Sequence, residues 1–153
     1  MQVRITEGAF DPHAEAASFA EGRTDAGALV SFVGYCRGTT AGHAVSELYL
    51  DHYPGFTEPE IARIAASARD RFDLIDLLVI HRVGAVAPGD AIVLVAALSV
   101  HRAEAFAAAS ALMDYLKTDA PLWKKESGPD GTRWIEPTSE DRARRAAVEK
   151  VTS

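Results

Sequence analysis

The chain has 153 residues, 48% of them hydrophobic and 25% charged, which is the size and composition of one globular domain. Its net charge of −6 argues against sequence-independent nucleic-acid binding, and its single cysteine excludes an internal disulfide and a cysteine-rich metal site. The sequence contains no run of 18 apolar residues that would predict a membrane-spanning helix. Its first residues resemble neither a secretory signal nor a transit peptide. We therefore expect a cytoplasmic protein.

The N-terminal third predicts a strand, a helix and a second strand. Residues 2–6 alternate like a strand, and Asp11 followed by Pro12 predicts the start of a helix that ends near Glu21. Residues 27–36 are rich in β-branched and aromatic types, which predicts a buried strand.

The next segment predicts a loop, a strand and an amphipathic helix. Residues 37–44 are Gly/Thr-rich and are expected to form a mobile surface loop before a strand at 45–52. Thr57 and Glu60 have the spacing of a capping box, which predicts a helix to about residue 72. Its apolar stripe comprises Ile61, Ile64, Ala65, Ala68 and Phe72.

Two apolar runs, 74–83 and 91–100, predict a pair of central strands joined by a turn. The Ala-rich segment 101–118 then predicts a helix, which ends before Pro121. Its apolar side chains on or near one face are Phe106, Leu112, Met113 and Leu116.

The C-terminal part predicts a hairpin and a charged helix. A Pro-Asp-Gly turn at 129–131 joins two candidate strands, 123–127 and 132–136. Residues 138–153 read as a charged C-terminal helix or tail. Because strands and helices do not alternate strictly, the order predicts one α+β domain over residues 1–153, with a mixed or antiparallel sheet and flanking helices.

His101 and Arg102 stand where an apolar strand gives way to a helix, so they fall at a helix N-terminus. Free backbone N–H groups at that position favour an anion, which makes the pair a candidate phosphate or carboxylate site. The alternative is that the pair only starts a surface helix, because the helix-dipole effect is worth only ~0.3–1 kcal/mol.

Lys117 lies in the last turn of the same helix, and Lys124 follows on a segment that Pro121 forces to turn back. The two amines can converge, and shielding from water lowers the pKa of a lysine and makes it usable as a base. The alternative is two solvated charges. Strand alternation places Lys125 opposite Lys124 and puts Glu126 on the face of Lys124, where its carboxylate can hold the amine.

Arg37 follows a strand and has a guanidinium group suited to phosphate, although many such arginines are surface residues. Cys36 ends the same apolar strand, where cysteine commonly packs as a small hydrophobe rather than acting as a nucleophile. The remaining histidines, including His81, lack metal-ligand spacing and are expected to have structural or surface roles.

The segment MDYLKTDAPLWKKE at 113–126 resembles the most distinctive stretch of the large subunit of molybdopterin synthase. Further similar segments follow the same order over nearly the whole chain. They are FVGYCRG (32–38), LDHYPGFTEPE (50–60), IHRVGAVAPGD (80–90), SVHRAEAF (99–106) and GTRWIE (131–136).

This resemblance implies an α/β hammerhead fold, a homodimer of large subunits, and a heterotetramer completed by two small ubiquitin-like sulfur-carrier subunits. The implied reaction transfers two sulfurs from the C-terminal Gly-Gly thiocarboxylate of the carrier to cyclic pyranopterin monophosphate, which forms the dithiolene of molybdopterin. It implies a sulfurtransferase that needs no metal or organic cofactor. Apolar strands such as 91–100 also favour a homodimer, because one small domain does not readily cover them.

The resemblance also implies the residues of the site. Lys117 and Lys124 match the catalytic lysines of the family. One position departs from the pattern, because many relatives have a lysine where this chain has Tyr35. The implied substrate-binding residues are Tyr35, Cys36, Arg37, His101, Arg102, Lys117, Lys124, Lys125 and Glu126.

Two other functions stay open at this point. The cationic residues can hold the carboxylate tail of a partner in a non-enzymatic binding module. A sulfurtransferase that uses the Cys36 thiol is the other alternative, and it predicts loss of activity in Cys36→Ser.

Overall fold

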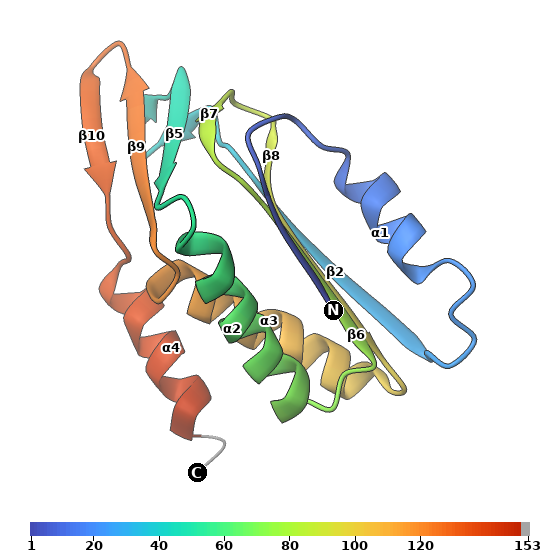
Figure 1. The fold of residues 1–153 in the computed structure, drawn as a ribbon. Helices are drawn as coiled ribbons and strands as arrows, with labels where there is room; N and C mark the ends of the chain where they lie inside the picture. The colour runs from blue at the N-terminus through green and yellow to red at the C-terminus, as the bar shows by residue number, and fades with distance from the viewer. Residues whose placement is uncertain (151–153) are drawn as a thin grey trace.

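The structure is a computed structural model that describes residues 1–150. It is an α+β fold with two four-stranded sheets, a short two-stranded hairpin and four helices (Figure 1). In chain order the elements are β1 (Gln2–Thr6), α1 (Pro12–Ala20), β2 (Ala28–Tyr35), β3 (Thr39–Thr40), β4 (His43–Ala44), β5 (Glu47–His52), α2 (Thr57–Arg71), β6 (Asp76–Arg82), β7 (Gly84–Val86), β8 (Ala91–Ser99), α3 (Arg102–Thr118), β9 (Leu122–Gly128), β10 (Gly131–Ile135) and α4 (Ser139–Lys150).

The first sheet has the strand order β1-β6-β8-β2. β8 runs antiparallel to both of its neighbours, whereas β1 is parallel to β6, so the expected mixed sheet is confirmed. All nine residues of β8 are buried, because strands flank it on both edges and helices cover both faces. The two apolar runs are therefore central strands, as predicted, and the short strand β7 lies between them in the chain.

Helices pack on both faces of this sheet. α2 and α3 cover one face, where Ile61, Ala65 and Leu112 pack against Val79 and Val95. α1 lies on the other face (Figure 1), where Phe19 packs against the cluster that contains Leu78 and Leu94. The alanines of α3 that face the core have small side chains, which let the helix lie close to the sheet.

Two burial predictions are wrong. The segment 27–36 is not a buried strand, because β2 lies at the edge of its sheet and leaves Leu29 40% and Phe32 42% exposed. Phe106 does not join the apolar face of α3 and is 62% exposed. These three side chains and the free edge of β2 are therefore open to contact with another molecule.

The second sheet has the order β10-β9-β5-β7 and carries the predicted hairpin β9–β10. Its own small core contains Leu48, Leu50, Val86 and Ile92. The segment 37–44 lies at the surface as predicted, but it contains regular structure that its composition did not predict, because β3 and β4 pair there as a two-stranded hairpin. Its turn has a positive φ at Ala41 (49°) and at Gly42 (81°), the combination that a two-residue type I′ hairpin turn requires.

The helix starts follow the prediction at α1 and depart from it at α2. Asp11 caps α1 as predicted, since its side chain accepts hydrogen bonds from the N–H groups of His13 and Ala14. Thr57 is not an N-cap. Its hydroxyl accepts from the Tyr53 N–H (2.8 Å) and donates to the Pro121 carbonyl (3.0 Å), which ties the start of α2 to the turn before β9.

The C-terminal helix α4 begins at Ser139 and packs against α3. Residues 151–153, the last part of the predicted tail, lie outside the described residues. None of the helices within residues 1–150 is both long enough and apolar enough to span a bilayer.

Candidate active site

A cleft of about 870 Å³ lies where the end of β2, strands β5 and β9, the end of α3 and the start of α4 meet. We call it the lysine cleft, after Lys117 and Lys124, which both line it. Six of the nine residues expected at the site are among its lining residues: Tyr35, Cys36, Arg37, Lys117, Lys124 and Glu126.

Lys124 reaches the cleft from β9. It pairs across the sheet with Leu50 and Ile135, so its side chain stands on the face that β5 and β10 also present to the cleft. Burial lowers the pKa of Lys124, the positive charge of Lys117 lowers it further, and the Asp141 carboxylate opposes both effects. An amine of this kind loses its proton more readily than an exposed lysine and can act in proton transfer.

Lys117 reaches the cleft from the last turn of α3, as the sequence predicted. Its Nζ lies 3.1 Å from Oδ1 of Asp141, a carboxylate that α4 contributes. The sequence predicted α4 as a charged C-terminal helix but gave no sign that it supplies this partner. Thr138 and Asp141 do have the spacing of a capping box, but that signal locates a helix start and not its neighbour in space.

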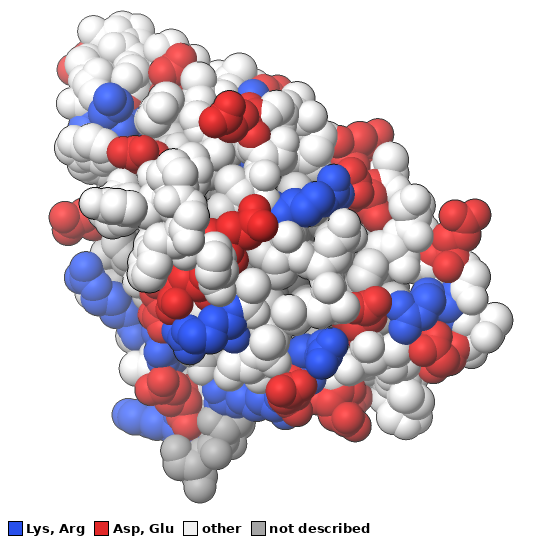
Figure 2. All heavy atoms as spheres, viewed as in Figure 1, with Lys and Arg blue, Asp and Glu red and all other residues white. Residues whose placement is uncertain are grey.

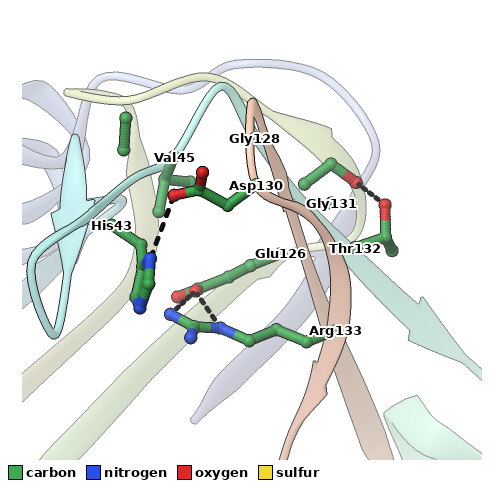
Figure 3. Close-up of a pocket in the computed structure, with 10 residues that line it drawn as sticks. His43, Val45, Glu126, Gly128, Asp130, Gly131, Thr132 and Arg133 are labelled. Atoms are coloured by element: carbon green, nitrogen blue, oxygen red, sulfur yellow. Dashed lines mark hydrogen bonds and ion pairs between the residues drawn. The ribbon is translucent and has the colours of Figure 1, made fainter.

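Glu126 does not hold the Lys124 amine. It is buried, and its carboxylate binds Arg133 (3.1 Å) and the Thr40 hydroxyl (2.9 Å) instead. Figure 3 shows Glu126 facing Arg133 in a smaller cavity of about 110 Å³, with His43 bonded to Asp130 at its rim (3.0 Å). Glu126 therefore fastens the β3–β4 hairpin to β9–β10 beside the lysine cleft.

Cys36 is 4% exposed, and its thiol contacts the Arg37 carbonyl (3.7 Å). Burial raises the pKa of this thiol, and the nearby carboxylates of Glu126 and Asp90 raise it further. Because the thiolate is the nucleophilic form, this environment disfavours sulfur chemistry at Cys36.

Two more residues of the lysine cleft were not predicted. His81 on β6 lines it and is 4% exposed; burial, and then the charge of Lys124, lower its pKa to about 4. The lowered pKa keeps the ring neutral, and its Nδ1–H donates to the Arg82 carbonyl (2.8 Å), which fixes its orientation. Arg142, in the first turn of α4, adds a cation to the cleft wall. A lone histidine on an apolar strand and an arginine in a charged helix gave no signal of either position.

Lys125 lies outside the lysine cleft, on the opposite face of β9, as strand alternation predicts. Its Nζ stands over the rings of Tyr49 (5.6 Å) and Trp134 (5.4 Å), which are its neighbours on the two adjacent strands. Its contacts are those of a surface cation–π cluster.

His101 and Arg102 are also absent from the cleft of their own chain. They begin α3, whereas Lys117 ends it, and the rise of 1.5 Å per residue separates the two ends by about 22 Å. His101 has the extended backbone of an N-cap residue but makes no side-chain capping bond. One copy of the chain therefore does not bring all the expected cations together.

Charge on the rest of the molecule is mixed. On the face that Figure 2 shows, Lys and Arg side chains are interspersed with Asp and Glu. The lysine cleft is also mixed: Arg37, Lys117, Lys124 and Arg142 line it together with the acids Glu126, Glu136 and Asp141. Two of these acids are already paired, Glu126 with Arg133 and Asp141 with Lys117 and Arg144. Within residues 1–150, no group of three His, Cys, Asp or Glu side chains is arranged to hold a metal ion.

Comparison with known proteins decides the family. Residues 5–119 match the family model described as MoaE protein. The chain belongs to the MoaE family. It is 52% identical over 134 residues to the molybdopterin synthase catalytic subunit of Ralstonia nicotianae, covering 88% of this chain and 76% of that one.

Solved structures of MoaE proteins have the same fold. The MoaE protein from Burkholderia ambifaria aligns with a TM-score of 0.79 and 44% identity, covering 95% of this chain and 96% of that one. The complex of subunits 1 and 2 of molybdopterin-converting factor from Helicobacter pylori contains a chain with a TM-score of 0.71 and 22% identity, covering 90% of each chain. The MoaE chain described here is thus an enzyme of molybdenum cofactor biosynthesis, with the function of a molybdopterin synthase catalytic subunit.

Proposed function

We propose that the lysine cleft transfers sulfur, in two rounds, from the C-terminal thiocarboxylate of a small ubiquitin-like carrier to cyclic pyranopterin monophosphate. The observation that carries this proposal is the meeting of two lysine amines in one cleft, one of them with a lowered pKa. In each transfer the thiocarboxylate sulfur forms a C–S bond in place of a C–O bond of the precursor, whose oxygen leaves. Water then cleaves the carrier C–S bond and leaves a carboxylate, so the sulfur keeps its oxidation level and no oxidant is needed.

The two lysines have complementary properties for this reaction. Lys117 is half exposed and bound to Asp141, which suits a cation that stabilises negative charge as the thiocarboxylate attacks. Lys124 is partly buried with a lowered pKa, which suits proton transfer. Positioned proton transfer of this kind contributes ~10²–10⁴-fold in rate.

The proposed substrate contacts come from the mouth and walls of the cleft. Arg37 provides a guanidinium group for the phosphate, and Tyr35 provides a phenol, 48% exposed, where many relatives have a lysine. Cys36 and Glu126 line the wall and hold its shape, because one is packed in a core cluster and the other is ion-paired. Lys125 only borders the site from the far face of β9.

A second copy of the chain can supply the missing cations. Ala28, at the start of β2, pairs with Ser99, two residues from His101, whereas Tyr35 at the other end of β2 lines the lysine cleft. If two copies pair antiparallel through their free β2 edges, the start of one β2 lies beside the end of the other. His101 and Arg102 of the partner subunit then approach the cleft, and the exposed Phe32 is covered.

The carrier is the third component. The related Helicobacter pylori subunit was solved in complex with its subunit 1, and we propose that this chain likewise forms a heterotetramer of two large and two small subunits in the cytoplasm. Only residues of this chain and the carrier take part in the proposed reaction, which uses no metal or organic cofactor.

The test is a reconstitution. The chain is incubated with thiocarboxylated carrier and cyclic pyranopterin monophosphate, and the product is oxidised to a fluorescent pterin and quantified. The proposal predicts product with thiocarboxylated carrier and none with carrier that ends in an ordinary carboxylate. A binding module without activity yields no product in either arm.

The same assay tests the thiol mechanism. Cys36→Ser is expected to retain most of the product yield, because the buried thiol has a raised pKa and the carrier supplies the sulfur. A loss of activity in correctly folded Cys36→Ser would favour the sulfurtransferase that uses this thiol.

A further inference from the structure

We propose that Asp141 is a positioning residue that holds the amine of Lys117 at the wall of the lysine cleft. This inference rests on the proposed function of the cleft and adds a residue to it. Asp141 lies in the first turn of α4, and its Oδ1 is 3.1 Å from Nζ of Lys117 at the end of α3. The carboxylate side chain is 7% exposed and the lysine side chain 48%, so the fixed partner is the acid.

Asp141 is held in place by hydrogen bonds to both carboxylate oxygens and to its backbone N–H. Its Oδ2 accepts from the Thr138 N–H (2.9 Å), and its own N–H donates to the Thr138 hydroxyl (3.1 Å), which is a reciprocal capping box. Arg144 donates to Oδ1 (2.8 Å). The backbone hydrogen bond from Thr138 and then the bond from Lys117 hold the pKa of Asp141 well below its usual range. The carboxylate is therefore charged at the pH of the reaction.

This arrangement restricts the most flexible part of the proposed catalytic group. A lysine side chain loses much of its rotamer freedom when it is held in one position. Asp141 occupies one N–H of the Lys117 ammonium group and leaves two for ligands in the cleft. A group held before substrate arrives does not have to be ordered in the transition state.

Asp141 also lets two like charges share the cleft. The groups whose charge acts on Lys124 from neighbouring elements are Lys117 on α3 and Asp141 on α4. His81 on β6 faces the same amine but is neutral, and Glu126, two residues along β9, is neutralised by Arg133. Asp141 is thus the carboxylate that offsets the repulsion between the two lysines.

The variant Asp141→Asn tests the proposal, with Glu140→Gln as the matched control. Asparagine keeps the oxygen that accepts from the Thr138 N–H but loses the charge that Lys117 pairs with. Glu140 is the neighbouring acid, 78% exposed, and it shares Arg144 but does not contact Lys117. With full-length chain, thiocarboxylated carrier and precursor, we expect kcat of Asp141→Asn to fall roughly 10- to 100-fold with little change in KM. Glu140→Gln should stay within about twofold of the wild type.

A second measurement does not depend on turnover. The chain has four lysines, so ¹³C-lysine labelling gives a spectrum in which each signal can be assigned by a Lys→Arg variant. Asp141→Asn should lower the pKa of Lys124 further, because a carboxylate that raises it is removed, whereas Glu140→Gln should leave that titration unchanged. If the wild-type chain forms no product, the proposed function fails, but this titration still tests the role of Asp141.

The alternative is that Asp141 only caps α4. Thr138→Ala removes the capping hydroxyl and leaves the Asp141 carboxylate in place, so it measures the cost of the cap alone through the melting temperature. If Asp141→Asn has wild-type kcat and an unchanged Lys124 titration, the positioning role is excluded. It is equally excluded if Asp141→Asn lowers only the melting temperature, to the extent that Thr138→Ala does.

Discussion

At the scale of single residues, His81 makes a prediction for stability. Its pKa is lowered from 6.5 to about 4 by burial and by the charge of Lys124, so folding favours the neutral ring. The stabilisation is complete above pH 6.5 and is lost as the pH falls from 6.5 towards 4, because the unfolded chain binds the proton first. The loss between pH 7 and pH 5 is expected to be ~2 kcal/mol.

Urea unfolding at the two pH values measures this loss. The control is His81→Gln, in which the side chain at this position does not titrate. Its stability should decrease less between the two pH values. An equal decrease in both proteins would assign the acid sensitivity to other groups.

Arg37 makes a prediction for binding. It lines the lysine cleft, and a charge-assisted hydrogen bond to phosphate is worth ~1.5–3 kcal/mol. Arg37→Ala should therefore weaken binding of the precursor by roughly 10- to 150-fold in a calorimetric titration. Arg63→Ala is the control, because Arg63 pairs with Glu60 on the surface of α2 and does not line the cleft. Equal affinity of Arg37→Ala and the wild type would place the phosphate elsewhere.

At the scale of elements, strand alternation in β9 separates two adjacent lysines. Lys124→Ala should lower product formation ~10²–10⁴-fold, because its amine lies in the cleft. Lys125→Ala should keep most activity and lose only the stacking with Tyr49 and Trp134, which is worth ~0.5–1 kcal/mol per exposed ring. Single-turnover assays and melting curves of both variants check this. A larger loss of activity in Lys125→Ala than in Lys124→Ala would reverse the assignment.

The sequence predicted the elements well where local chemistry determines them. Asp11-Pro12 starts α1, the run 91–100 forms a central strand, and the Pro-Asp-Gly turn closes the β9–β10 hairpin. The prediction of burial failed for β2, because burial depends on where a strand lies in the sheet. An apolar strand such as β2 has the same sequence pattern at the centre of a sheet and at its edge. Local periodicity therefore does not predict the strand order.

The site shows the same division. Tyr35, Arg37, Lys117 and Lys124 were brought together by family resemblance, and the structure places them around one cleft. Asp141 could not be foreseen, because its contact with Lys117 depends on how α4 packs on α3. The separation of Arg102 from Lys117 could have been predicted from the sequence alone, because a helix over 101–118 is about 25 Å long.

At the scale of the whole molecule, the shared cleft predicts a dimer. Light scattering should give a particle of twice the 16.4 kDa chain mass at micromolar concentration in the absence of carrier. The free β2 edge and the exposed Phe32 are the surfaces that such pairing would cover. A particle of single-chain mass would contradict the shared cleft.

Mixing two inactive variants tests which copy supplies which residue. In a mixed dimer of Lys117→Ala and Arg102→Ala, one cleft loses both groups and the other keeps both. Random exchange of equal amounts should therefore restore about a quarter of wild-type activity, because half the dimers are mixed and half their clefts are intact. No recovery, with mixed dimers verified by two affinity tags, would show that both groups act from one chain.

Single-turnover product formation by Lys117→Ala, with saturating thiocarboxylated carrier and precursor, tests most directly whether the lysine cleft carries the chemistry. Lys117 is half exposed, and Asp141 keeps its bonds to the Thr138 N–H and Arg144 without it, so the variant should fold and still bind carrier. We expect product formation to fall ~10²–10⁴-fold while carrier binding is unchanged. Product formation near the wild-type rate under these conditions, where no slow binding step can hide the chemical step, would contradict the assignment of the lysine cleft as the active site.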